Sequence, residues 1–245
     1  MRVQLCGPFR IEIEGRRAEG RLPGRQGRLL FAYLVLNRPR AVPREELVDA
    51  LWPERPPARA GASLTILLSK LRAAVAPARV DGRNEVALVL PEGTEVDVQR
   101  ALEAVHRAES AVALGEWRRG WSPALTALLV AERRLLPDCE APWLDEWRRR
   151  LEDVHVRALE AYAAACLGIG GAELAAAERA ARRLVALAPY RENAHRLLIE
   201  AVAARGNVAE ALRVYEDLRH LLREELGVAP GVAVQAVHRR LLGAA

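Results

Sequence analysis

Residues 43–75 read PREELVDALWPERPPARAGASLTILLSKLRAAV and contain the two helices on which the predicted fold depends. A proline in the first turn with two glutamates close behind is typical of a helix N-terminus, and it predicts a short helix over residues 43–51. A longer helix is predicted over residues 58–75, because apolar residues recur there every three or four positions and Pro77 then stops the helix. The apolar face of this longer helix consists of Leu64, Leu67, Leu68, Leu71 and Val75.

The segments on either side complete a recognisable plan. Residues 1–20 alternate apolar and polar side chains like short strands, and residues 24–36 carry a helical apolar stripe. Residues 79–90 predict a hairpin with Asp81-Gly82 at its turn. Strands, three helices and a closing hairpin make a winged helix-turn-helix, in which the longer helix enters the major groove of DNA and the hairpin lies along the backbone or minor groove. The alternative is a small α+β domain of no particular function.

The charge distribution favours a polyanion-binding front part. Residues 1–95 carry 16 basic and 11 acidic side chains, whereas residues 96–245 carry 21 of each, so the whole net charge of +5 lies in front. A positive half beside a neutral half is typical of a nucleic-acid-binding module attached to another domain. A solvated basic face without a partner is the alternative.

The candidate DNA contacts lie on the longer helix and around it. With the leucines inward, the 100° step of a helix turns Arg59, Ser69 and Lys70 outward, where they are placed to reach phosphates or base edges. Ala62 and Ile66 share this face and are placed to touch thymine methyl groups; alternatively Ile66 packs on a neighbour. Further candidates on the same helix, the hairpin and the two earlier helices are Ser63, Arg72, Arg79, Arg83, Arg44, Arg25 and Arg28. Each arginine taken alone is equally compatible with a solvated surface residue.

From Asp97 onward the apolar spacing is almost purely helical. Helices are predicted over residues 98–114, 122–136, 141–167, 174–187, 191–205 and 208–226. Ala177, Ala181 and Leu184 recur 34 positions later as Ala211, Tyr215 and Leu218, the period of tetratricopeptide-like helix pairs. Such an array either stabilises the chain or offers a surface to a partner or a second copy.

Other features limit the class of protein. Cys6, Cys139 and Cys166 are few and form no CxxC pair, which predicts small core residues, not a metal site. No apolar run is long enough to cross a bilayer and no signal peptide begins the chain, so a cytoplasmic protein is expected. No catalytic motif is present, so we expect no enzyme and no cofactor. The tryptophans of the helical part are predicted to pack in the core, and the run Arg148-Arg149-Arg150 is predicted to lie on a solvated helix face.

Several stretches in both halves resemble the SARP-type bacterial regulators, in which an OmpR-type winged helix precedes a bacterial transcriptional activation domain. In the N-terminal part these stretches are Leu5-Cys6-Gly7-Pro8-Phe9, residues 44–53 (REELVDALWP) and residues 64–72 (LTILLSKLR), with Val96-Asp97-Val98 at the junction. In the C-terminal part they are Pro142-Trp143-Leu144, residues 192–198 (ENAHRLL), residues 206–212 (GNVAEAL) and residues 225–230 (ELGVAP). The hairpin departs from the family, because Asn84-Glu85 stands where relatives commonly have Gly-Tyr.

The resemblance implies a mainly α protein with a winged helix-turn-helix over residues 1–95 and an all-α tetratricopeptide-like activation domain over residues 96–245. It further implies an activator that binds double-stranded DNA at direct repeats, as a homodimer or paired protomers, and engages RNA polymerase. Many relatives continue into an ATPase or sensor module; no GxxxxGK loop occurs here, so a stand-alone form is expected. The alternative is a scaffold or adaptor that keeps the fold without tight DNA binding.

Overall fold

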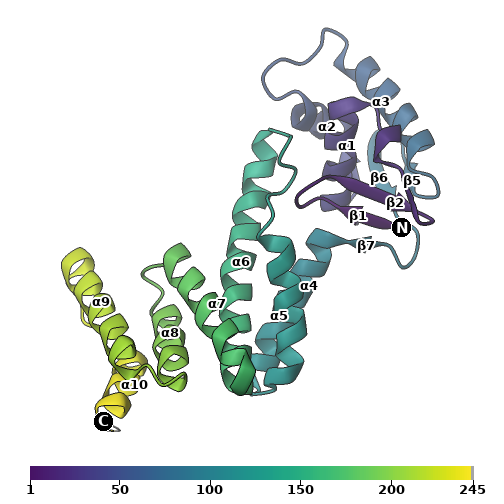
Figure 1. Cartoon of the computed structure of the whole chain (residues 1–245). Coiled ribbons are helices and arrows are strands. Elements are labelled where there is room, and N and C mark those ends of the chain that lie inside the picture. Colours follow the sequence, from purple (N-terminus) through teal and green to yellow (C-terminus); the bar gives the residue numbers. More distant parts are fainter. Residues whose placement is uncertain (244–245) are drawn as a thin grey trace. The chain divides into compact units, whose positions relative to one another are not determined.

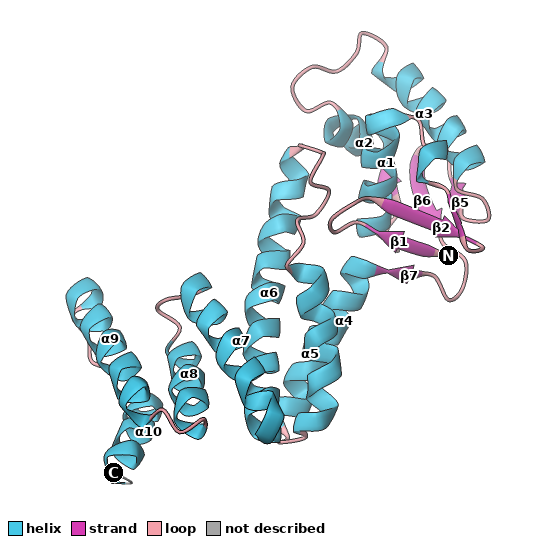
Figure 2. Cartoon of the chain, in the orientation of Figure 1, coloured by secondary structure: helices cyan, strands magenta, loops and turns pink. Residues whose placement is uncertain are grey.

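The computed structural model describes residues 1–243 and groups the chain into two compact units. The first unit consists of Met1–Arg100 together with Arg133–Leu151, and the second of residues 101–132 together with residues from 152 onward. Most of the chain is helical, and the strands belong to the first unit (Figures 1 and 2). No helix in residues 1–243 is long and apolar enough to cross a membrane.

Two small sheets belong to the first unit. The larger has the order β3-β2-β1-β7, in which β7 pairs with β1 in parallel and the other neighbours are antiparallel. Its strands are β1 (Arg2–Gln4), β2 (Arg10–Ile13), β3 (Arg16–Arg17) and β7 (Glu95–Val96). The predicted strand character of residues 1–20 is confirmed, whereas β7 was not predicted, because a two-residue strand has no detectable periodicity.

Three helices and a hairpin complete the first unit. The helices are α1 (Gly24–Leu36), α2 (Arg44–Leu51) and α3 (Ala60–Ala74), each within two residues of its predicted bounds, and a short 3₁₀ turn, η1 (Glu19–Arg21), precedes α1. The strands β5 (Arg79–Asp81) and β6 (Glu85–Val89) form the predicted hairpin, and β4 (Val42–Pro43) pairs with the outer side of β6. Leu64, Leu68 and Leu71 of α3 are buried as predicted.

The helices of the second unit match the prediction less evenly. They are α4 (Asp97–Ala113), α5 (Trp117–Ala131), α6 (Pro142–Ile169), η2 (Gly171–Glu173), α7 (Leu174–Leu187), α8 (Glu192–Ala204), α9 (Val208–Leu226) and α10 (Val232–Gly243); the first turns of α4 and α6 belong to the first unit. The prediction of a helix over 122–136 was wrong by five residues at each end. Leu135 and Leu136 are unavailable to a helix, because their backbone pairs with Cys6 and Leu5. The helix α10 was not predicted.

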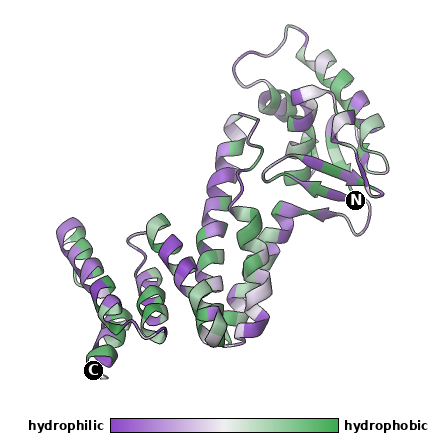
Figure 3. Cartoon of the chain, viewed as in Figure 1, coloured by the Kyte–Doolittle hydropathy of each residue, from purple (hydrophilic) through white to green (hydrophobic). Residues whose placement is uncertain are grey.

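The repeat read from the sequence corresponds to packed positions. Ala177, Ala181 and Leu184 of α7 are buried, and so are their counterparts 34 residues later in α9. The helix α8 lies against both α7 and α9, as expected for stacked helix pairs. Both hydrophobic (green) and hydrophilic (purple) segments occur along α7, α8 and α9 (Figure 3), as expected for helices that each bury one face.

The first unit extends beyond residues 1–95 because segment 133–151 packs into it. The Trp143 indole N–H donates to the carbonyl oxygen of Ala50 at 3.2 Å, and the Gln26 amide donates to Leu51 at 3.2 Å. Both carbonyls lie in the last turn of α2, where no intrahelical donor exists. Trp143 therefore completes the end of α2, and its predicted core role is performed in the first unit.

A polar contact links α1 to α2 beside this tryptophan. The Tyr33 ring meets Trp143 edge to face at 5.0 Å, and its hydroxyl donates to a carboxylate oxygen of Glu46 at 2.6 Å. Arg40 donates to the same carboxylate. The hydrogen bonds from Arg40, and then from Tyr33, outweigh burial and lower the pKa of Glu46 to about 2. The carboxylate is thus held ionised between the two helices.

Replacing Trp143 with phenylalanine keeps a ring but leaves the Ala50 carbonyl without its donor. We expect the free energy of unfolding in urea to fall by about 1–2 kcal/mol, the cost of an unsatisfied backbone acceptor. The matched control is Trp147→Phe, one turn later, whose ring lies under Arg150 at 5.0 Å. An equal loss in both variants would contradict the assignment.

Glu46→Gln should lose stability in a pH-dependent way. The folded pKa of about 2 lies below the unfolded value of about 4.3, so the stabilisation is fully present above about pH 4.3 and is lost as pH falls towards 2. The difference in unfolding free energy between wild type and Glu46→Gln should therefore be largest at neutral pH and shrink from pH 4 to pH 2. Glu45→Gln, at an exposed neighbour, should show little of this trend. A difference that is constant with pH argues against the carboxylate contact.

Candidate nucleic-acid interface

The outer face of α3 has the predicted orientation. Ala62, Ile66, Ser69, Lys70 and Ala73 are exposed, and Ser63 is half-buried on the flank. Arg59 is exposed at the N-cap of the helix. The stretch from Arg55 to Val80 contains five basic residues and no acidic residue. The helix therefore presents a solvent-facing stripe without a negative side chain of its own.

Arg44 connects α2 to the start of α3 and to the turn of the hairpin. One of its guanidinium nitrogens donates to the Gly61 carbonyl at 3.1 Å and to the Thr65 hydroxyl at 2.7 Å, and another donates to the Arg83 carbonyl at 3.5 Å. These partners lie in the first turns of α3 and in the hairpin turn, while Arg44 itself begins α2. The sequence predicted a phosphate contact for Arg44; the structure adds a positioning role that local spacing could not reveal.

Arg72 holds the hairpin against α3. Its Nε donates to the Val80 carbonyl at 2.8 Å and its Nη2 to the Gly82 carbonyl at 3.1 Å. A planar guanidinium with several N–H groups in fixed directions suits such a double contact with backbone oxygens. The turn of the hairpin is thereby fixed relative to the exposed stripe.

The hairpin turn itself is set by Gly82. Its φ is +96°, and a Cβ atom built there would lie 1.9 Å from the Glu85 carbonyl oxygen, so only glycine fits. Val86 and Leu88 anchor the hairpin in the core. Around the turn Arg83 is exposed, and Arg79 forms an exposed ion pair with Asp81 at 3.6 Å.

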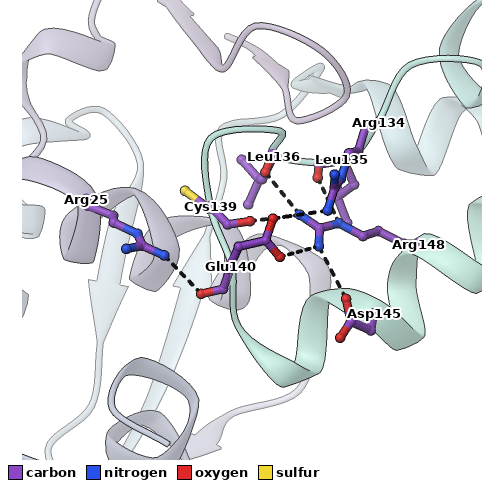
Figure 4. A network of polar contacts seen from close by, with 8 residues as sticks. All are labelled: Arg25, Arg134, Leu135, Leu136, Cys139, Glu140, Asp145 and Arg148. Atoms are coloured by element: carbon purple, nitrogen blue, oxygen red, sulfur yellow. Dashed lines mark hydrogen bonds and ion pairs between the residues drawn. The ribbon is translucent and has the colours of Figure 1, made fainter. Parts of the chain in front are cut away.

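The structure places Arg25 and Arg28 beside segment 139–140. Arg25 donates to the Glu140 carbonyl at 3.1 Å (Figure 4). Burial raises the pKa of the Cys139 thiol, and the positive charges of Arg25 and then Arg28 lower it in part. Cys6, Cys139 and Cys166 are all buried, as predicted.

The prediction of a solvated face was wrong for Arg148. Its side chain is only 10% exposed, and it donates to the carbonyls of Leu135, Leu136 and Cys139 as well as to the carboxylates of Glu140 and Asp145 (Figure 4). The hydrogen bond that Glu140 accepts from Arg148 lowers the pKa of the Glu140 carboxyl. Three carbonyls of an irregular segment need donors, and a buried guanidinium supplies them. A run of arginines in sequence carries no sign of this long-range demand.

Asp97 fixes the junction between strand β7 and helix α4. Its carboxylate accepts the backbone N–H groups of Leu5 and Cys6 at 2.9 Å each and that of Val98 at 2.8 Å. Burial raises the pKa of Asp97, and these N–H donors oppose the rise. Burial, with the nearby Asp97 charge, also raises the pKa of the Cys6 thiol. Among residues 1–243 no group of three or more His, Cys, Asp or Glu side chains is placed to hold a metal ion.

Comparison with known proteins identifies the family. The model of the bacterial transcriptional activator domain matches residues 96–242. The chain belongs to this family. The resemblance to SARP-type regulators, which carry this domain, is thereby confirmed. No enzyme family is indicated by these matches.

Similar activator-domain proteins are regulators by name. The regulatory protein AfsR of Streptomyces coelicolor is 33% identical over 246 residues, which cover the whole of this chain but 24% of AfsR. The transcriptional regulatory protein EmbR of Mycobacterium tuberculosis is 30% identical over 97% of this chain and 62% of EmbR. A structure of M. tuberculosis EmbR in complex with a low-affinity phosphopeptide has a TM-score of 0.81 and 27% identity, covering 99% of this chain and 65% of that one. The chain thus spans about a quarter of AfsR and under two thirds of EmbR.

The hairpin should depend on the conformation of Gly82. Gly82→Ala would force a side chain into both a positive φ and the Glu85 oxygen, so we expect a loss of about 2 kcal/mol or more in unfolding free energy, with faster amide exchange at Val86 and Leu88. Gly93→Ala is the control, because Gly93 also has a positive φ, +72°, but a Cβ there meets nothing within 4 Å. It should cost about 1 kcal/mol. Equal effects would show that the hairpin turn is not tightly defined.

Proposed function

We propose that the chain is a DNA-binding transcriptional activator whose first unit works as a winged helix. In this proposal α2 supports α3, α3 enters the major groove as the recognition helix, and the β5–β6 hairpin is the wing. The observation that carries it is the exposed, acid-free stripe of α3, which Arg44 and Arg72 hold in fixed relation to the hairpin. The order of strands, three helices and hairpin supports the same assignment.

The proposed direct contacts lie on α3 and on the wing. Arg59, Ser63, Ser69 and Lys70 face the groove from α3, and Arg79 and Arg83 face the backbone from the wing. Arg44 and Arg72 act mainly by positioning, because their guanidinium groups are bonded to backbone carbonyls, although each keeps N–H groups for a phosphate. Arg25 and Arg28 are candidates for further backbone contacts. Most bonds of this kind orient the protein without reading sequence.

The activator domain is proposed to engage RNA polymerase, a second copy of the chain, or both. Its support is the family description and the names of the relatives. Paired protomers on direct repeats would also bring two recognition helices to one site, which raises affinity through effective concentration.

A salt titration tests the proposal. Duplexes selected from a random pool by the full chain should bind with a steep, linear fall of log affinity against log salt, about −0.9 per phosphate contact. The double variant Arg59→Ala/Lys70→Ala should bind more weakly, and its slope should be shallower by up to about two contacts, with a nearly unchanged thermal midpoint.

The matched control removes two positive charges from the second unit. Arg107 and Arg118 are exposed and form no ion pair among residues 1–243, so Arg107→Ala/Arg118→Ala changes net charge equally. Its slope should stay close to that of the wild type. Weak binding that is blind to sequence, or equal slopes in both double variants, would favour an adaptor over a DNA-binding regulator.

A further inference from the structure

Ile66 is an exposed apolar side chain at the centre of a polar surface. The exposed fraction of this residue is 57%. Among the described residues of the first unit, Val89 is the one other large hydrophobic residue that is exposed, at 42%. Ile66 lies at the middle of the stripe on α3, with Ala62 one turn before it and Ser69 and Lys70 one turn after it. Isoleucine is also a poor choice for an exposed helical position on propensity grounds, since its branched Cβ restricts χ1.

The neighbours of Ile66 on the stripe are small. Ala62 and Ala73 end at Cβ and Ser69 at a hydroxyl, so Ile66 projects beyond them along this face. Apart from the long side chains of Arg59 and Lys70, Ile66 is therefore the largest side chain on this stripe, and a flat partner that approaches closely would contact it. The rise of a helix puts Lys70 about 6 Å further along the axis, which corresponds to nearly two base-pair steps of duplex.

The surrounding charge identifies the kind of partner. Arg59 and Lys70 flank Ile66 on the same helix, and no acidic residue occurs from Arg55 to Val80. A polyanion that also offers an apolar group on its surface is therefore complementary to the stripe. Duplex DNA meets both requirements, because the C5-methyl group of thymine is an apolar feature of the major-groove edge.

We propose that Ile66 is a specificity-determining residue that selects thymine by packing on its C5-methyl group in the major groove. The inference rests on the proposed function, which it makes more specific: the preferred sites contain thymine at the position facing Ile66. Lys70 and Ser69 reach the neighbouring phosphates or base edges, and these contacts set the register in which the methyl group meets the isoleucine. The readout at this position thus depends on shape and apolar contact, without a hydrogen bond.

Replacing thymine with deoxyuridine tests the contact, because it removes only the methyl group. The full chain is first used to select its preferred duplex from a random pool, and each thymine of that site is then replaced singly by deoxyuridine. At one or two positions the wild-type affinity should fall about four-fold, the weight of one buried methyl-sized group. The Ile66→Ala variant should bind more weakly and should bind the thymine and deoxyuridine duplexes equally at those positions.

Leu129→Ala is the matched control, since it shortens a similarly exposed apolar side chain on α5, outside the proposed DNA-binding surface. It should keep the wild-type preference for thymine, and circular dichroism should show that all variants remain folded. Deoxyuridine without effect at every position, or an unchanged thymine preference in Ile66→Ala, overturns this inference while DNA binding stands. A chain that binds no duplex at all overturns the proposed function and this inference with it.

Discussion

The last turn of α2 ends in carbonyl groups that have no partner within the helix, and the first unit satisfies them from elsewhere. Trp143 donates to Ala50 and Gln26 donates to Leu51. An unsatisfied carbonyl in a covered position costs on the order of 1–3 kcal/mol, a large share of the stability of a small domain. The same demand recurs at residues 135–139, where Arg148 supplies the donors. The supporting helix of the proposed recognition surface therefore depends on a segment that lies some ninety residues away in sequence.

The arginines of the first unit serve two different purposes. Arg44, Arg72 and Arg148 direct their guanidinium groups at backbone oxygens and so fix the positions of α3, the hairpin and the 135–140 segment. Arg59 and Arg83 are exposed, as is Lys70. Loss of a positioning arginine would disturb DNA binding through geometry, whereas loss of Arg59, Lys70 or Arg83 would act through charge. Counting basic residues alone does not distinguish the two.

Local patterns predicted the elements well and their long-range partners poorly. The bounds of α1, α7 and α9 and the buried leucines of α3 follow from periodicity, because each helix buries one face. The end of α5 was mispredicted because Leu135 and Leu136 look helical in isolation but pair with the first strand region. The role of Arg148 was mispredicted, and the partner of Trp143 was not predicted, for a related reason: both side chains donate to backbone carbonyls that no side-chain pattern records. For the candidate site, the outward face of α3 was predictable from helix geometry, while the positioning roles of Arg44 and Arg72 were not.

The balance of charge explains why a polyanion would be directed to the first unit. The second unit is rich in arginine, but many of these side chains are paired with carboxylates, as Arg157 is with Glu109, Arg182 with Glu178 and Glu210, and Arg196 with Glu200. Exposed pairs of this kind contribute little to stability, yet they cancel the field that free arginines would produce. The excess positive charge is consequently concentrated in the first unit, where the acid-free stretch 55–80 includes α3. Such an arrangement gives a proposed regulator its affinity through phosphates, and it leaves selectivity to the few side chains that project from the recognition helix. With small residues on most of that face, a single large side chain such as Ile66 can decide which base is accepted.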